Sequence, residues 1–290
     1  MKNQALNHLL SQLQLERLEV NLFRGQSQDL GWGTVFGGQV LGQSLSAAAQ
    51  TVPKDRQVHS LHGYFLQPGD PKLPIIYDVD QIRDGKSFTT RRVVAIQKGR
   101  AIFNMSSSFQ IQEPGLEHHD TMPTVEGPEG LASESELVTA LAHKVPPALR
   151  EVFSKQMPIE IRPVHPIDPF APSSAPLPRY TWFRAASKLP DDPAIHRYLL
   201  AYASDFHLVT EALVPHGRSF LPPSMQAASL DHAMWFHRPV NMDEWLLYAV
   251  DSPSASGARA LARGRFFNQQ GQLLASTAQE GLIRIRDGNP

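Results

Sequence analysis

The stretch "GGQVLGQSLSAAAQTV" at residues 37–52 combines an apolar stripe with small residues on its other faces. Leu41, Leu45, Ala48 and Val52 recur at helical spacing, which predicts a helix. Small residues on the remaining faces allow strands to approach this helix from several sides. The pattern favours an α+β fold in which a curled antiparallel sheet wraps the helix.

Strands and helices are predicted to occur twice in the same order. A helix at 37–52 precedes strands near 56–67, 74–83, 87–98 and 100–112, and a helix at 194–213 precedes strands near 225–238, 244–252, 257–268 and 272–285. Residues 64–68 (YFLQP) align with residues 235–239 (WFHRP) at an offset of 171. This indicates an internal duplication, with chance agreement between two antiparallel meanders as the alternative.

Prolines divide the chain. Of the 24 prolines, 14 lie between Pro114 and Pro193. Because proline interrupts helices and strand ladders, this section is predicted to be a connection with a short helix or two near residues 133–155. We therefore expect an N-terminal unit at 1–114, a proline-rich connection at 115–157 and a C-terminal unit at 158–290.

Composition excludes several classes of protein. Of the 290 residues, 41% are hydrophobic, and the net charge is -1, which predicts a globular cytoplasmic protein with no nucleic-acid partner. The sequence has no apolar run long enough for a membrane span and no signal peptide pattern. The absence of cysteine excludes disulfides, thiolate metal ligands and a cysteine nucleophile. We expect no metal and no cofactor.

Asp205 is an unusual residue within the predicted helix at 194–213. Its neighbours three and four positions away, Ala201, Tyr202, Leu208 and Val209, are largely apolar, so the acid is expected to be at least partly buried. A carboxylate in such surroundings is a candidate general base. A structural cap or a buried ion pair is the alternative.

Other motifs give weaker signals. His59 and His62, like His232 and His237, are separated by odd numbers of residues, so each pair faces opposite sides of a strand and is poorly placed to share a metal. The glycine-rich stretch at 31–38 lacks the spacing of a dinucleotide site, and the chain lacks the Gly-x-Ser-x-Gly elbow of a serine hydrolase.

Several long motifs, in order, resemble a known family. They are residues 22–48, 58–99, "LAYASD" at 200–205, 230–248 and "ASTAQEGLIR" at 275–284. Together they resemble type II acyl-CoA thioesterases of the TesB kind. The resemblance implies a double hotdog fold: two tandem hotdog units, each a long helix wrapped by a curved antiparallel sheet.

The resemblance also implies a catalytic set. It corresponds to Asp205, Ser229 and Gln279, with serine where some members of the family have threonine, and to His59 as a weaker, secondary active-site residue. The implied reaction is hydrolysis of acyl-CoA to a free fatty acid and coenzyme A by a water that Asp205 activates and the other two hold. The oxyanion donors would be backbone N–H groups near a helix end or Gln279 itself.

Two other functions remain open at this stage. One is a hotdog hydratase or dehydratase, although the text after Asp205, "DFHLVTE", lacks the hydratase motif Asp-x-Asn-Pro-x-His. The other is a non-catalytic acyl-CoA binding protein, against which the retained Asp205, Ser229 and Gln279 argue. A homo-oligomer is expected, because the edges of such sheets commonly pair with another subunit.

Overall fold

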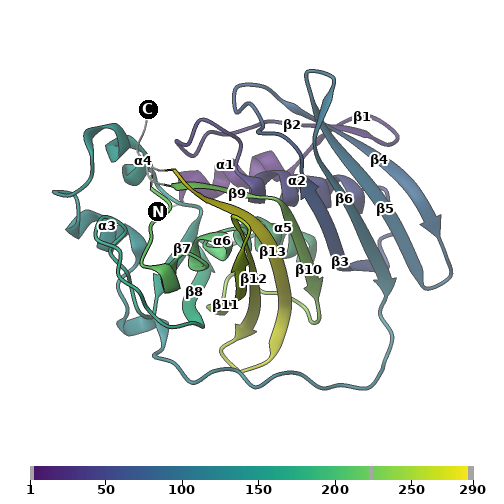
Figure 1. The fold of residues 1–290 in the computed structure, drawn as a ribbon. Coiled ribbons are helices and arrows are strands. Elements are labelled where there is room, and N and C mark those ends of the chain that lie inside the picture. Colours follow the sequence, from purple (N-terminus) through teal and green to yellow (C-terminus); the bar gives the residue numbers. More distant parts are fainter. Residues whose placement is uncertain (1–2, 222–224, 287–290) are drawn as a thin grey trace.

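One long antiparallel sheet wraps two helices in the computed structural model, which describes residues 3–221 and 225–286 (Figure 1). The helices are α2 (Gly37–Ala49) and α5 (Pro193–Ala203). The strand order is β1 (Glu16–Glu19), β2 (Leu22–Gly25), β4 (Ile75–Asp84), β5 (Phe88–Gln97), β6 (Arg100–Ile111), β3 (Arg56–Phe65), β10 (Asp231–Phe236), β13 (Leu273–Ile285), β12 (Arg259–Asn268), β11 (Leu246–Ser256), β8 (Arg179–Ala185) and β7 (Ile159–Pro163), with β9 (Met225–Ser229) also paired to β13. The α+β prediction is confirmed.

The two halves of the sheet meet where β3 pairs with β10. Tyr64 lies opposite Asp231 and Ser60 lies opposite Trp235, so this joint is symmetric at the offset of 171 residues found in the sequence. One large apolar core surrounds α2 and α5 and draws on both halves of the chain. A smaller cluster lies under the proline-rich section, around Trp182 and Trp245. The registers therefore agree with an internal duplication.

Helices α2 and α5 run antiparallel in close contact. A Cβ atom on Gly38 would lie 2.2 Å from the carbonyl oxygen of Tyr202, and one on Gly42 would lie 3.1 Å from that of Tyr198. Small residues are thus required for the helices to approach this closely. As a consequence, the N-terminus of α2 lies beside the C-terminus of α5, immediately before Asp205.

The predicted helix at 194–213 is interrupted, which corrects the placement of Asp205 in mid-helix. Helix α5 ends at Ala203 and a short helix α6 (Leu208–Glu211) follows, after His207 at φ 63°. The carbonyl of Ser204 accepts a hydrogen bond from the Tyr248 hydroxyl at 3.0 Å instead of continuing the helical ladder. The predicted strand at 225–238 is likewise divided, into β9 and β10, on either side of Leu230.

The proline-rich section contains more regular structure than expected. Its helices are α3 (Glu134–Ala140) and α4 (Arg150–Ser154), near the predicted positions, and it has 3-10 turns at Pro128–Gly130 and Pro147–Leu149. Outside this section, the N-terminal helix is α1 (Gln4–Leu13), and another 3-10 turn spans Val214–His216. Strands β7 and β8, which were not predicted, extend the C-terminal half of the sheet. The division into units at 1–114, 115–157 and 158–290 stays a prediction; its outermost residues, 1–2 and 287–290, lie outside the described residues.

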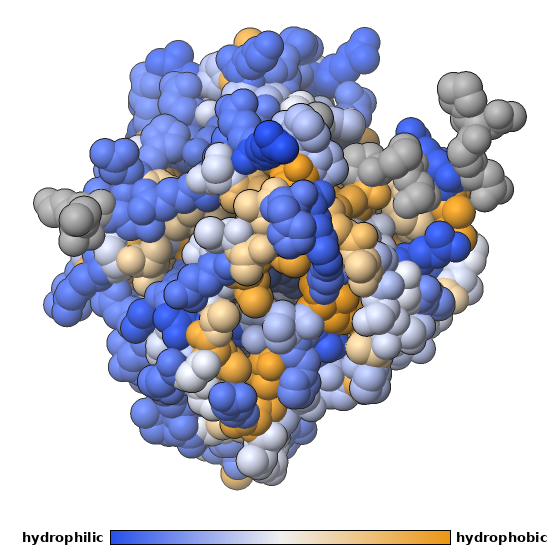
Figure 2. Space-filling view, turned by 90° about the vertical axis from the view of Figure 1, so that its left-hand side faces the viewer, coloured by the Kyte–Doolittle hydropathy of each residue, from blue (hydrophilic) through white to orange (hydrophobic). Residues whose placement is uncertain are grey.

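Helix α4 lies against the loop that leads into α2. The Lys155 ammonium donates to the carbonyl of Asp29 at 3.1 Å, and the rings of Phe153 and Trp32 meet edge to face. On the side of the molecule that carries α3 and α4, apolar residues reach the surface among hydrophilic ones (Figure 2). Across residues 3–221 and 225–286, no helix is long and apolar enough to cross a membrane.

Candidate active site

Asp205, Ser229 and Gln279 meet in one cluster. The amide nitrogen of Gln279 donates to Asp205 Oδ1 at 2.6 Å, and the Ser229 hydroxyl donates to the same oxygen at 3.4 Å. The Asp205 side chain is 4% exposed and Gln279 is 1% exposed. Residues separated by up to 74 positions thus surround one buried carboxylate.

Strand pairing explains how Ser229 and Gln279 come together. Ser229 ends β9 opposite Gly281 of β13, and Gln279 lies two residues earlier on the same face of β13. A Cβ atom at Gly281 would lie 2.4 Å from Val209 Cγ1, so glycine lets α6 approach this strand. The turn between α5 and α6 then holds Asp205 over Gln279.

The first half of the chain supplies the remaining contact to Asp205. The backbone N–H of Gly38, in the first turn of α2, donates to the carboxylate. A Cβ atom on Gly37 would lie only 2.7 Å from Asp205 Oδ2. The partial positive charge at the N-terminus of a helix stabilises a carboxylate placed there. The cluster is therefore built from both halves, at the junction of α2 and α5.

Two opposing effects act on the pKa of Asp205. Burial raises it, whereas hydrogen bonds from Gln279, Gly38 and Ser229 lower it, and the net result is a pKa above the usual 3.8. A carboxylate with a raised pKa is a stronger base than an exposed one when it is ionised. The arrangement is therefore suited to removing a proton from a bound molecule.

His232 belongs to this cluster, although the sequence suggested for it only an unfavourable metal geometry. It is 1% exposed, and its Nδ1 lies 3.1 Å from the amide nitrogen of Gln279. The alternation of β10 contained the signal, because His232 shares its face with the buried Met234 and Phe236. The alternation could therefore have identified His232 as an inward-facing candidate site residue, on the strand next to that of Gln279.

The structure does not bring His59 to Asp205. His59 lies at an irregularity of β3, half-buried, with its Nε2 2.8 Å from Ser108 Oγ and its ring against Phe88. Tyr64, which pairs with the start of β10, is five positions further along the strand. None of the contacts described for His59 involves the Asp205 cluster, so its secondary role receives no support.

In the first half of the chain, Arg91 occupies the position that corresponds to the Asp205 cluster. Strand β6 corresponds to β13, with Ser107 at the place of Gln279, and Arg91 lies opposite Ser107 as Ala262 lies opposite Gln279. Arg91 is 1% exposed and its guanidinium donates to Thr51. This half therefore has a buried cation where the other half has a buried carboxylate.

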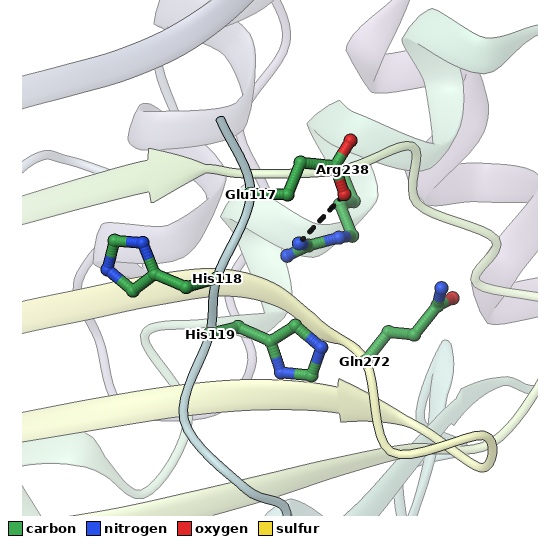
Figure 3. A pocket seen from close by; sticks show the side chains of 5 residues that line it. All are labelled: Glu117, His118, His119, Arg238 and Gln272. Carbon is green, nitrogen blue, oxygen red and sulfur yellow. Dashed lines mark ion pairs between the residues drawn. The ribbon is translucent and has the colours of Figure 1, made fainter. Parts of the chain in front are cut away.

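A surface hollow elsewhere gathers two histidines. It is lined by Glu117, His118, His119, Arg238 and Gln272, where the chain before α3 crosses the turn into β13 (Figure 3). Arg238 and Glu117 lie 3.7 Å apart in an ion pair. The hollow is beyond the opposite end of β10 from Asp231, away from the Asp205 cluster. Within the described ranges, no group of three or more metal-binding side chains was found.

Family models match both halves of the chain. The model described as "Acyl-CoA thioesterase N-terminal domain" matches residues 27–110, and that described as "Acyl-CoA thioesterase" matches residues 148–282. Acyl-CoA thioesterase 2 of Haemophilus influenzae is 46% identical, over 97% of this chain and 99% of its own length. Human acyl-coenzyme A thioesterase 8 is 41% identical, over 94% of this chain and 88% of its own length.

Solved structures give the same result for the fold. An acyl-CoA thioesterase II, TesB2, from Mycobacterium marinum is 42% identical with a TM-score of 0.79, covering 97% of this chain and 100% of that one. A hotdog-fold protein of unknown function from Alicyclobacillus acidocaldarius, 20% identical, has a TM-score of 0.75 over 97% of this chain and 99% of that one, and supports the fold alone. The predicted double hotdog is confirmed, and the chain belongs to the acyl-CoA thioesterase family.

Proposed function

We propose that this protein hydrolyses acyl-CoA thioesters with a water molecule that Asp205 activates. The supporting observation is a buried carboxylate held by Gln279 and the N-terminus of α2, with a raised pKa. In this reaction, the water oxygen attacks the thioester carbonyl carbon while Asp205 takes a proton from the water. The carbon–sulfur bond then breaks, the proton passes to the departing thiolate, and a fatty acid and coenzyme A are released.

Ser229 and Gln279 are proposed to position that water. Both contact Asp205 Oδ1, so a water beside this oxygen is within reach of all three side chains. Gln279 Oε1 is buried and, among the residues described, makes no hydrogen bond, which suits it to accept from the water. Fixing the water in this way removes part of the entropic cost of attack.

Backbone N–H groups are the better candidates for the oxyanion donors. The amide nitrogen of Gln279 has two hydrogens, and these face Asp205 and His232. The first turn of α2 lies directly beside the carboxylate, and the N–H of Gly38 faces it. We therefore propose that this turn stabilises the charge that develops on the carbonyl oxygen.

The test is release of coenzyme A from a panel of acyl-CoAs of different chain lengths, followed with a thiol reagent. Wild type should release thiol, and Asp205→Asn should lose at least about 10²-fold in kcat, the usual contribution of a general base. Asp251→Asn is the matched control, because Asp251 lies on β11 in a surface ion pair with Arg263. Absence of thiol release from every substrate would exclude hydrolysis and favour a binding protein.

A hydratase or dehydratase is tested in the same samples. Incubation with an enoyl-CoA and a hydroxyacyl-CoA would convert one into the other without release of thiol if that function were correct.

The homo-oligomer stays a prediction, to be measured by light scattering of the purified protein. Its physical basis is that β1 and β7 end the strand order, so each leaves an edge at which a second copy would pair.

A further inference from the structure

His232 lies between two polar side chains inside the protein. Its Nε2 is 3.0 Å from the hydroxyl of Ser204, and its Nδ1 is 3.1 Å from the amide nitrogen of Gln279. Its side chain is fully buried. The pairing of β10 with β13 sets this arrangement, because His232 is one position before Ala233, which lies opposite Ala278.

The hydrogen bonds determine where the ring carries its proton. The Ser204 hydroxyl donates its single hydrogen to the carbonyl of Ala201 at 2.8 Å, so it must accept from His232. Nε2 of His232 therefore bears the hydrogen. Burial lowers the pKa of His232 to about 3, which keeps the ring uncharged and leaves a lone pair on Nδ1.

This lone pair determines which way the Gln279 amide faces. His232 Nδ1 and the Asp205 carboxylate both accept hydrogen bonds, and only the nitrogen of the amide can donate to them. If the amide were turned over, Gln279 Oε1 would oppose both acceptors. The Asp205 carboxyl tolerates that contact only when it is protonated, and in that state it cannot accept a proton from water.

We propose that His232 is a positioning residue that holds the Gln279 amide with its nitrogen toward Asp205, so that the carboxylate stays ionised and Gln279 Oε1 is free to accept from the reacting water. The relay begins at the Ala201 carbonyl and passes through Ser204 and His232 to the site. This inference rests on the proposed function, in which Asp205 is the general base.

Two substitutions test the two ring nitrogens of His232 separately. His232→Asn retains an acceptor near the place of Nδ1 and is expected to keep kcat within about threefold of wild type. His232→Gln reaches the place of Nε2, keeps a partner for Ser204 and loses the acceptor for Gln279; kcat should fall by about tenfold or more with KM little changed. Thermal unfolding of each variant checks that it is folded. Equal losses in the two variants would overturn the proposal.

A double-mutant cycle then asks whether His232 acts through Gln279. In the Gln279→Ala background, His232→Gln should have no further effect on kcat. If the two losses multiply instead, His232 acts by another route and the proposal is wrong. This inference alone would be rejected if wild type releases thiol, Asp205→Asn is inactive, and the losses caused by His232→Gln and Gln279→Ala multiply. The proposed function would then remain intact.

The proton position has a readout that does not depend on activity. Nitrogen NMR of the histidine-labelled protein, with His232→Asn to assign the signal, should report an uncharged ring with hydrogen on Nε2 between about pH 5 and pH 8. A charged ring, or hydrogen on Nδ1, would overturn the proposal even in an active enzyme. If wild type releases no thiol, the proposed function fails, and the positioning role in hydrolysis fails with it.

Discussion

A single methyl group added at Gly37 should strongly reduce activity without unfolding the protein. The Cβ atom of Gly37→Ala would lie 2.7 Å from Asp205 Oδ2 and 2.9 Å from the Phe65 ring. Ordinary contacts begin at 3.4 Å, so the carboxylate or the helix end must move by about 0.7 Å. A displacement approaching 1 Å costs on the order of 10²-fold in rate, and we expect kcat to fall by about 30- to 100-fold.

Stability should change much less than activity in this variant. Alanine favours a helix over glycine by about 1 kcal/mol, which offsets much of the overpacking cost of about 1–3 kcal/mol. The assay is thiol release with parallel thermal unfolding. Gly42→Ala is the matched control on α2, since its Cβ contacts begin at 3.1 Å and involve Leu13 and the Tyr198 carbonyl. Wild-type kcat in folded Gly37→Ala would refute the placement of the carboxylate against α2.

Four further predictions concern ionisation and the buried arginine. Because the pKa of Asp205 is raised, kcat/KM should increase with pH along an acidic limb with a midpoint above 3.8. Asp205→Asn should melt no lower than wild type at pH 7, and any gain should vanish below pH 3.8, where the wild-type carboxyl is protonated in both the folded and the unfolded states. Arg91→Met leaves the Thr51 carbonyl without its donor, and chemical denaturation should report a loss on the order of 3 kcal/mol. Burial lowers the pKa of His207, but the nearby Glu134 more than offsets this and raises it to about 9. The ion pair of His207 with Glu134 makes its full contribution to stability at pH 6, below the usual pKa of histidine, and loses it as the pH rises through about 9. Glu134→Gln should therefore lower the melting temperature at pH 6 and have little effect at pH 9.5.

The fold was largely predictable because it depends on local periodicity. The small-residue helix at 37–52 and the alternating strands of each half were found from their spacing, and β5, β6, β12 and β13 lie close to the predicted ranges. Strands β7 and β8 were missed because the surrounding prolines argue against strands, and pairing with β11 overrides that local signal.

The site was only partly predictable for a related reason. The motif resemblance indicated Asp205, Ser229 and Gln279. The break after α5 could not be seen, because it depends on the hydroxyl of Tyr248, 44 positions further along the chain. The contact between Asp205 and Gly38 joins the two halves, and no pattern within either half encodes it.

The central claim is that the buried carboxylate of Asp205 activates the water that hydrolyses an acyl-CoA. Its most direct test is the rate of thiol release by wild type and Asp205→Asn under saturating acyl-CoA at the same pH. The predicted result is rapid release by wild type and at least about a 10²-fold lower kcat in a variant that remains folded. Equal kcat values for the two proteins would contradict the claim.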